Sequence, residues 1–462
     1  MASDWKPGRL RDIADIVMGQ SPTADYVNEA CKGKPLLNGP TEFGSMHPTP
    51  VQFTTDVRKK ANPGDLLFCV RGSTTGRMNW ADQEYAIGRG LAAIRHRDGD
   101  DFQHFVRAVI ELKLPELLAA ATGSTFPNVG RDQLLDIPAS IPPKGEQRVI
   151  SRFFKDIDDK IDLNRRINQT LEAMAQAIFK SWFVDFVPVQ AKIAAKQEGR
   201  DALRAAMSAI SGKADAELDD LPPEQYDSLA ATAALFPDEL EESELGETPK
   251  GWIVSDMRTL AEVISKGTTP NKSDIANAKD VPIVPFVKVK DISEDGEIAR
   301  GNLELIARSI HESSLKRSIL KTDDLLFSIA GTIGRTAFVD DDLNGANVNQ
   351  AIAFIRLKDK LDHFALCWLT LRSIETKNFI ASKVVQAVQA NASLANVGDI
   401  PVRLPGNDVL KKWNSVVSPL ILEYRARLGE IRTLATLRDT LLPKLMSGEL
   451  SVTALTESTG VA

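Results

Sequence analysis

Apolar residues recur at alternating four- and three-residue spacings from Ile150 to Trp182. This heptad spacing is typical of a helix that packs along a partner helix. No Pro or Gly interrupts the stretch, so we predict a helix of about 35 residues, roughly 50 Å long at 1.5 Å per residue. Two polar residues, Asn164 and Asn168, occupy the middle of this seam.

A second seam with the same spacing begins 263 residues later, at Trp413, and ends at Leu445. We predict that the two helices pack antiparallel, with Asn164, Asn168 and Arg427 setting the register at some cost in stability. The alternative is two unrelated amphipathic helices, each packed on its own core. The seam positions that we expect between the helices are Ile157, Ile161, Leu171, Ile178, Leu420, Tyr424, Leu434 and Leu441.

The segments in front of the two helices also correspond in pairs, and the pairs follow the same order. Leu-Leu-Phe at 66–68 and at 325–327 each begins a buried strand pattern that enters a Gly-rich turn ending in Gly-Arg. Such ordered similarity indicates one ancestral unit of about 190 residues that is present twice. The matched pairs are 4–23 with 251–270, 64–77 with 323–335, 87–95 with 348–356, and 136–138 with 399–401.

These patterns predict an α+β fold with a pseudo-twofold internal duplication. Two mixed, strand-rich domains are separated by two long antiparallel helices in a coiled-coil-like pair. We expect domains at 1–145 and 251–405, spacer helices at 146–186 and 406–450, an acidic Ala/Pro-containing linker at 187–250, and a flexible tail at 451–462.

The net negative charge is concentrated in one segment of the chain. The 462-residue chain has a net charge of −7, but residues 187–250 alone carry 6 basic and 14 acidic side chains, a local charge of −8. The remaining segments are near neutral, which is compatible with a basic face for phosphate binding and does not require one. The start, MASDWKPGRL, lacks the apolar core of a signal peptide, and three scattered cysteines fit a reducing compartment. We therefore expect a cytoplasmic protein without a metal site.

Enzyme motifs are missing from the sequence. It contains no Asn/Asp-Pro-Pro-Tyr/Phe segment of an amino-methyltransferase, no phosphate-binding glycine loop and no dinucleotide fingerprint. Asp158-Asp159-Lys160 superficially resembles part of a nuclease motif. Because it falls on the predicted helix away from the seam, we interpret it as a solvated charge cluster. We expect no catalytic residue in this chain.

Four phrases carry a resemblance to a known family. They are TFPNVGRDQLLDIP at 125–138, KSWFVDF at 180–186, SELGETPKGW at 243–252 and LRDTLLPKLMSGEL at 437–450. Together with the duplication, they resemble the specificity subunit (S, HsdS) of type I restriction-modification systems over nearly the whole chain.

The resemblance implies a DNA-binding subunit without catalytic activity. Each domain would be a target recognition domain that reads one half of a bipartite, asymmetric site in double-stranded DNA. The helices would set the gap and dock two methyltransferase (M) subunits, and two restriction (R) subunits would join them. The resemblance also implies that S-adenosylmethionine, ATP and Mg²⁺ bind to those partners and not to this chain. A bivalent protein-interaction scaffold that does not read DNA is the competing hypothesis.

Polar turns that recur at matched positions are the candidate DNA contacts. Arg pairs with guanine and Asn or Gln with adenine, whereas Ser, Thr and Lys more often hold phosphates. Arg77 and Arg335 recur in both copies, so we expect phosphate or scaffold contacts there, while Arg89 against Gln350 should report on specificity. The candidates are Gln20, Ser21, Thr23, Arg71, Ser73, Thr74, Arg77, Arg89, Lys266, Thr268, Thr269, Lys288, Lys290, Thr332, Arg335, Asn349 and Gln350.

Overall fold

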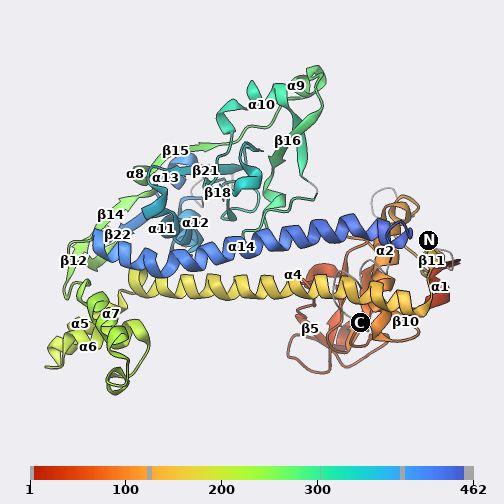
Figure 1. The fold of residues 1–462 in the computed structure, drawn as a ribbon, viewed down its shortest axis with the longest axis horizontal. Helices are drawn as coiled ribbons and strands as arrows, with labels where there is room; N and C mark the ends of the chain where they lie inside the picture. The colour runs from red at the N-terminus through yellow and green to blue at the C-terminus, as the bar shows by residue number, and fades with distance from the viewer. Residues whose placement is uncertain (1–4, 122–126, 302, 385–390, 452–462) are drawn as a thin grey trace. The chain divides into compact units, whose positions relative to one another are not determined.

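The computed structural model describes residues 5–121, 127–301, 303–384 and 391–451. The chain divides into two compact units (Figure 1). Unit 1 comprises residues 1–166 and 429–462, and unit 2 comprises residues 167–428. Each unit contains one strand-rich domain and parts of two long helices, α4 (Lys144–Phe179) and α14 (Asn407–Met446).

Three sheets form the domain of unit 1. A four-stranded sheet has the order β2-β10-β7-β8, a five-stranded sheet has the order β3-β5-β4-β9-β6, and β1 pairs with β11 as a ribbon. The strands are β1 (Lys6–Arg9), β2 (Ala14–Met18), β3 (Val27–Asn28), β4 (Lys34–Leu37), β5 (Gln52–Thr54), β6 (Lys60–Ala61), β7 (Leu66–Cys69), β8 (Met78–Trp80), β9 (Tyr85–Ile87), β10 (Leu91–His96) and β11 (Pro138–Ile141). The helices are α1 (Leu10–Ile13), α2 (Gln103–Ala119) and α3 (Arg131–Leu135).

The domain of unit 2 repeats this plan. Its four-stranded sheet has the order β15-β21-β18-β19, β14 pairs with β22, and a third sheet has the order β17-β16-β20. The strands are β14 (Ile253–Asp256), β15 (Ala261–Lys266), β16 (Pro282–Val287), β17 (Glu304–Ala307), β18 (Leu325–Ser328), β19 (Thr336–Phe338), β20 (Asn347–Val348), β21 (Ile352–Leu357) and β22 (Pro401–Leu404). The helices are α8 (Met257–Leu260), α9 (Lys272–Asn277), α10 (Arg308–Glu312), α11 (Lys360–Arg372), α12 (Ile374–Val384) and α13 (Leu394–Gly398). The predicted α+β duplication is confirmed.

The same backbone hydrogen bond closes both domains near the Asp-Ile-Pro segments. The Leu10 amide donates to the Ile137 carbonyl at 2.9 Å, and the Met257 amide donates to the Ile400 carbonyl at 2.9 Å. Each bond ties the start of a short helix to the strand that precedes a long helix. The sequence match of 136–138 with 399–401 therefore corresponds to one repeated structural feature.

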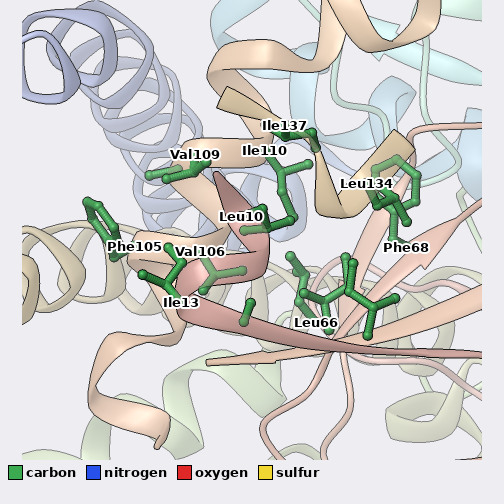
Figure 2. Close-up of a cluster of buried hydrophobic side chains, with 14 of the residues drawn as sticks. Leu10, Ile13, Leu66, Phe68, Phe105, Val106, Val109, Ile110, Leu134 and Ile137 are labelled. Carbon is green, nitrogen blue, oxygen red and sulfur yellow. The ribbon is translucent and has the colours of Figure 1, made fainter. Parts of the chain in front are cut away.

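A core of buried side chains joins the unit 1 domain to the long helices. Figure 2 shows this cluster, with Leu10, Ile110 and Ile137 between Phe105 on one side and Leu134 on the other. The same cluster includes Ile150 from α4 and Leu445 from α14, both fully buried. Burying apolar side chains from α2, α4 and α14 together holds these elements in one unit.

The helices are antiparallel within unit 1. Asp158 contacts Arg438, while Lys160 lies 3.3 Å from Glu430, so rising numbers in α4 meet falling numbers in α14. In unit 2 the ring of Phe183, in a π-helical turn after α4 (Lys180–Val184), contacts Trp413 edge-on. Among the predicted seam residues, Ile157, Ile161 and Tyr424 are buried, and the group that is half-buried comprises Leu171, Ile178, Leu420, Leu434 and Leu441.

Residues 187–250 correct the linker interpretation, because much of this segment is folded. It forms α5 (Val187–Gln197), α6 (Ala202–Ser211), α7 (Pro223–Ala234) and the hairpin β12 (Leu240–Ser243) with β13 (Gly246–Pro249). Ala206, Met207, Leu218 and Ala233 give the helices a small buried core. The ammonium group of Lys192 is buried with them and donates to the Phe236 carbonyl at 2.6 Å. Of these helices, the alanine-rich sequence indicated only the stretch at 201–210, which corresponds to α6. No helix in the described part of the chain is long and apolar enough to cross a membrane.

Candidate nucleic-acid interface

Four loops meet at one edge of the unit 1 sheets. Strands β2, β7 and β10 all reach this edge, where Met18 pairs with Ala92 and Cys69 pairs with Leu91. The Gln20 amide donates to the Ile87 carbonyl at 2.9 Å, which ties residues 19–23 to residues 88–90. The structure therefore brings together polar turns that are distant in sequence.

Unit 2 has the same edge, built from the same elements. The Gly267 amide donates to the Ile352 carbonyl at 3.1 Å, as the Gly19 amide does to Leu91 at 2.8 Å. The Asn349 amide donates to Val287 at 3.1 Å, as the Gly88 amide does to Leu37. We call the two places the unit 1 edge (loops 19–23, 38–39, 70–77 and 88–90) and the unit 2 edge (loops 267–270, 288–290, 329–335 and 349–350).

All the candidate residues lie in the loops of these two edges except Lys266, the last residue of β15, and most are exposed. The exposed candidates are Gln20, Ser21, Thr23, Arg71, Ser73, Arg77, Arg89, Lys266, Thr268, Thr269, Lys290, Thr332 and Gln350. The half-buried candidates are Thr74, Lys288, Arg335 and Asn349. The Thr269 hydroxyl donates to Gln350, and the Arg89 amide donates to Ser21 at 3.3 Å, so matched pairs of candidates touch in both units.

Two matched arginines hold neighbouring loops. Arg335 donates to the Ile292 carbonyl at 2.7 Å, and Arg77 lies 3.4 Å from the Pro40 carbonyl oxygen. Both contacts are to backbone carbonyls, which supports the expectation of a scaffold contact. Arg71 and Arg89, by contrast, have exposed side chains at the unit 1 edge.

Sequence reasoning missed one amide, Asn38, at the unit 1 edge. Asn38 is exposed after β4, and its side-chain nitrogen donates to Gln52 at 3.1 Å. Because β4 runs parallel to β9 as β16 does to β20, Asn38 occupies the position that Lys288 has in unit 2. The signal was an apolar pair followed by a polar residue, Leu36-Leu37-Asn38 against Phe286-Val287-Lys288.

Two glycines allow the loops to approach closely. A Cβ atom on Gly19 would lie 2.1 Å from the Gly88 carbonyl oxygen, and one on Gly267 would lie 1.8 Å from the Val348 oxygen. Neither distance is sterically possible, and both obstacles are backbone atoms. The Gly-x-x-Pro turn is therefore required for the geometry of each edge.

Charge at the edges is mixed. Lys288 pairs with Glu304 and lies over the ring of Phe286 at 5.7 Å. Asp56 accepts from Arg58 at 2.7 Å, and this hydrogen bond lowers the pKa of the Asp56 carboxyl group below its usual range. Such local pairs orient cations and do not cancel the exposed arginines of the unit 1 edge.

The structure corrects the interpretation of Asp158 as part of a solvated charge cluster. It is buried, and its carboxylate accepts from Arg107 at 2.8 Å and from Arg438 at 3.1 Å. Asp159 is exposed and pairs with Lys155. Since its partners lie on α2 and α14, Asp158 links the domain to both helices of unit 1.

Comparisons with known proteins identify a family. The family described as "Type I restriction modification DNA specificity domain" matches residues 2–173 and 249–412. Similar proteins include the HindI specificity subunit of Haemophilus influenzae, 27% identical over 97% of this chain and 100% of that protein. The MjaIX specificity subunit of Methanocaldococcus jannaschii is 23% identical over 98% of this chain and 95% of that protein.

A solved structure is also similar along the chain. The S subunit of the type I restriction-modification system from M. genitalium aligns with 96% of each chain at 14% identity, with a TM-score of 0.48. The family match covers both strand-rich domains and more than half of the chain. This protein therefore belongs to the type I restriction-modification DNA specificity family.

Proposed function

We propose that this chain is the DNA-reading subunit of a type I restriction-modification complex. The unit 1 edge reads one half of a bipartite, asymmetric site, and the unit 2 edge reads the other half. The two halves differ because the edges present different side chains on one backbone plan. The chain directs N6-adenine methylation or ATP-dependent restriction and is not itself catalytic.

One observation carries this proposal: matched edge positions hold different hydrogen-bonding groups. Arg89 corresponds to Gln350, and Asn38 corresponds to Lys288, while the strands beneath pair in the same order. Arginine is suited to bidentate bonds with guanine, and glutamine or asparagine to bonds with adenine. A fixed frame with exchangeable polar groups is what two readers of different sequences require.

The long helices set the length of the unread gap and dock two methyltransferase subunits, and two restriction subunits complete the assembly. S-adenosylmethionine, ATP and Mg²⁺ bind to those partners. The missing nucleotide and methyltransferase motifs support this division of labour. Hydrogen bonds and phosphate contacts from the edges would give affinity that falls steeply with salt.

The test is long-read detection of N6-methyladenine in cells that carry this chain and its methyltransferase partner. A second strain carries a chimaera in which residues 251–405 come from a relative of different specificity. We expect a split motif in which only one half changes. The matched control exchanges residues 1–145 and should change only the other half.

A continuous motif, or methylation that does not depend on this chain, would contradict the proposal. The bivalent scaffold would then be favoured, because it predicts partner binding without any DNA sequence dependence. Retention on duplex DNA, competed by only one bipartite sequence, separates the two hypotheses in vitro.

A further inference from the structure

Each unit contains an apolar pocket where a strand ribbon, a helix and the end of a long helix meet. In unit 1 a cavity of about 400 Å³ lies between β1, β11, α2 and the end of α14. In unit 2 a cavity of about 300 Å³ lies between β22, α11, α12 and the turn after α4. Both volumes fall at the lower end of the range of ligand-binding pockets. We call them the unit 1 pocket and the unit 2 pocket.

The two pockets are built from corresponding residues. The strand after each Asp-Ile segment contributes its proline and the residue two positions later, and the domain helix contributes two residues three positions apart. The end of the opposite long helix also lines each pocket, with Met446 in unit 1 and with Phe179, Phe183 and Val184 in unit 2. The pairs are Pro138 with Pro401, Ser140 with Arg403, Val109 with Thr370, Leu112 with Ser373, and Met446 with Phe183.

Both pockets lie on the ribbon and long-helix framework, and none of their lining residues belongs to the loops of the reading edges. Residues that read DNA differ between the copies, because each copy reads a different half-site. A site repeated on the ribbon and helix framework instead suits one partner that binds twice. We propose that the two pockets bind the same apolar segment of two copies of one partner protein, with a carboxylate of that segment beside a basic side chain at each pocket.

A basic side chain at each pocket is the evidence that the proposed segment carries a carboxylate. Arg403 lines the unit 2 pocket, and its Nε atom is buried without a hydrogen-bond partner among the described residues. Burial lowers the pKa of this guanidinium, so an added carboxylate would compensate a charge that the fold leaves poorly solvated. Glu375 lines the same pocket, and its charge raises the pKa of Arg403 by less than burial lowers it.

Lys113 has the corresponding role in the unit 1 pocket. It pairs with Glu116 at 2.9 Å, and the Glu116 side chain is 68% exposed. An exposed pair of this kind contributes little stability, so a partner carboxylate can replace Glu116 at low cost. The apolar walls, with Met446 buried beneath them, would take the hydrophobic side chain of the segment.

This inference rests on the proposed function, because the partner expected in two copies is the methyltransferase subunit. The test fills each pocket with tryptophan at an accessible residue. Ser140→Trp fills the unit 1 pocket from an exposed position, and Leu245→Trp fills the unit 2 pocket from the turn between β12 and β13. Val57→Trp and Leu361→Trp are controls, since both residues are exposed and neither lines these pockets.

Native mass spectrometry of the complex with the purified methyltransferase subunit measures the number of copies bound. We expect two copies on the wild-type chain and on both controls, and one copy on each filled variant. The doubly filled chain should bind at least tenfold more weakly than wild type. Arg403→Gln should weaken only one of the two binding events.

Two copies on the doubly filled chain at wild-type affinity would overturn the inference. Loss of both copies from a single filled variant would also overturn it, because each pocket serves one copy. Unchanged thermal unfolding of the variants excludes misfolding, and Ser140→Met with Leu245→Phe provides a milder pair. If the wild-type complex does not retain bipartite duplex DNA, the proposed function fails. If it retains the duplex but filling changes nothing, only the pocket assignment fails.

Discussion

The carboxylate of Asp158 in α4 lies 3.1 Å from a guanidinium nitrogen of Arg438 in α14. Asp158 is buried, and its other oxygen accepts from Arg107 of the domain helix α2 at 2.8 Å. One carboxylate thus joins three helices within unit 1. A buried ion pair of this kind adds little net stability over apolar packing, yet removing one of its partners is costly.

Asp158→Asn should destabilise unit 1 strongly. The substitution removes the carboxylate that Arg107 and Arg438 share, but Arg107 keeps Glu111 and Arg438 keeps Asp439, so we expect a loss near the lower end of the about 3–5 kcal/mol typical of broken buried pairs. Asp159→Asn is the control, because Asp159 is exposed and its loss should cost less than about 1 kcal/mol. Urea unfolding followed by circular dichroism measures both values. Equal effects of the two substitutions would contradict the buried ion-pair assignment.

Stability should fall in mild acid because of His104. Burial lowers the pKa of its imidazole from 6.5 to about 4, against the opposing attraction of Asp158 at 3.9 Å, and Arg107 and the Trp80 ring also face it. Between pH 6.5 and 4 the unfolded chain binds a proton that the folded chain does not. Stability is therefore lost as the pH falls through this window, by up to about 3 kcal/mol.

The comparison of wild type with His104→Gln isolates this contribution from that of the carboxylates. The unfolding free energy of each protein is measured at pH 7, 5.5 and 4.5. Between these pH values it should change less in His104→Gln than in wild type. His363→Gln, in α11 of unit 2, is the matched substitution and controls for the loss of a histidine as such. A wild-type slope in His104→Gln would assign the acid sensitivity to other groups.

Gly267→Ala should disable one reading edge and leave the other. The added Cβ would overlap the Val348 carbonyl oxygen, so the loop that carries Thr268 and Thr269 must move. We expect at least a tenfold loss of affinity for the full bipartite duplex. Gly406→Ala is the control, because a Cβ at that position meets nothing within 4 Å. Mobility-shift titrations at fixed salt measure the affinity.

The helix pair predicts the gap length of the DNA site. Seven residues inserted after Arg166 and seven after Leu428 lengthen both helices by about 10 Å. At about 3.4 Å per base pair, the unread gap should grow by roughly three base pairs, with both half-sites unchanged. Methylation mapping of the double insertion tests this. An unchanged gap would show that the helices do not act as a spacer.

Much of the architecture could be predicted from periodicity and repetition. The seam ending at Trp182 predicted a helix over 146–186, and α4 with its π-helical turn spans residues 144–184. Matching segments around Leu67 and Leu326 predicted the shared sheet plan. These signals are local or internally repeated, so the sequence alone contains them.

Features that depend on distant partners were not predictable. Asp158 appeared solvated because its partners, Arg107 and Arg438, are 51 and 280 residues away. Asn38 carried only the short match of 36–38 with 286–288, and its role follows from the parallel pairing of β4 with β9. The helical insert was obscured because alanine-rich, acidic sequence suits both short helices and disordered linkers.

The core of unit 1 has a consequence for how the chain is made. This core includes Leu445 and Met446 from the second part of the unit. The first part of the unit ends at Arg166, so the ribosome makes all of unit 2 between them. At typical synthesis rates of about 5–20 residues per second, roughly 15 to 60 s separate these two parts as they leave the ribosome. During that time the first domain waits with an open apolar surface. Translation that stops anywhere in unit 2 would therefore leave the first recognition domain without the α14 part of its core.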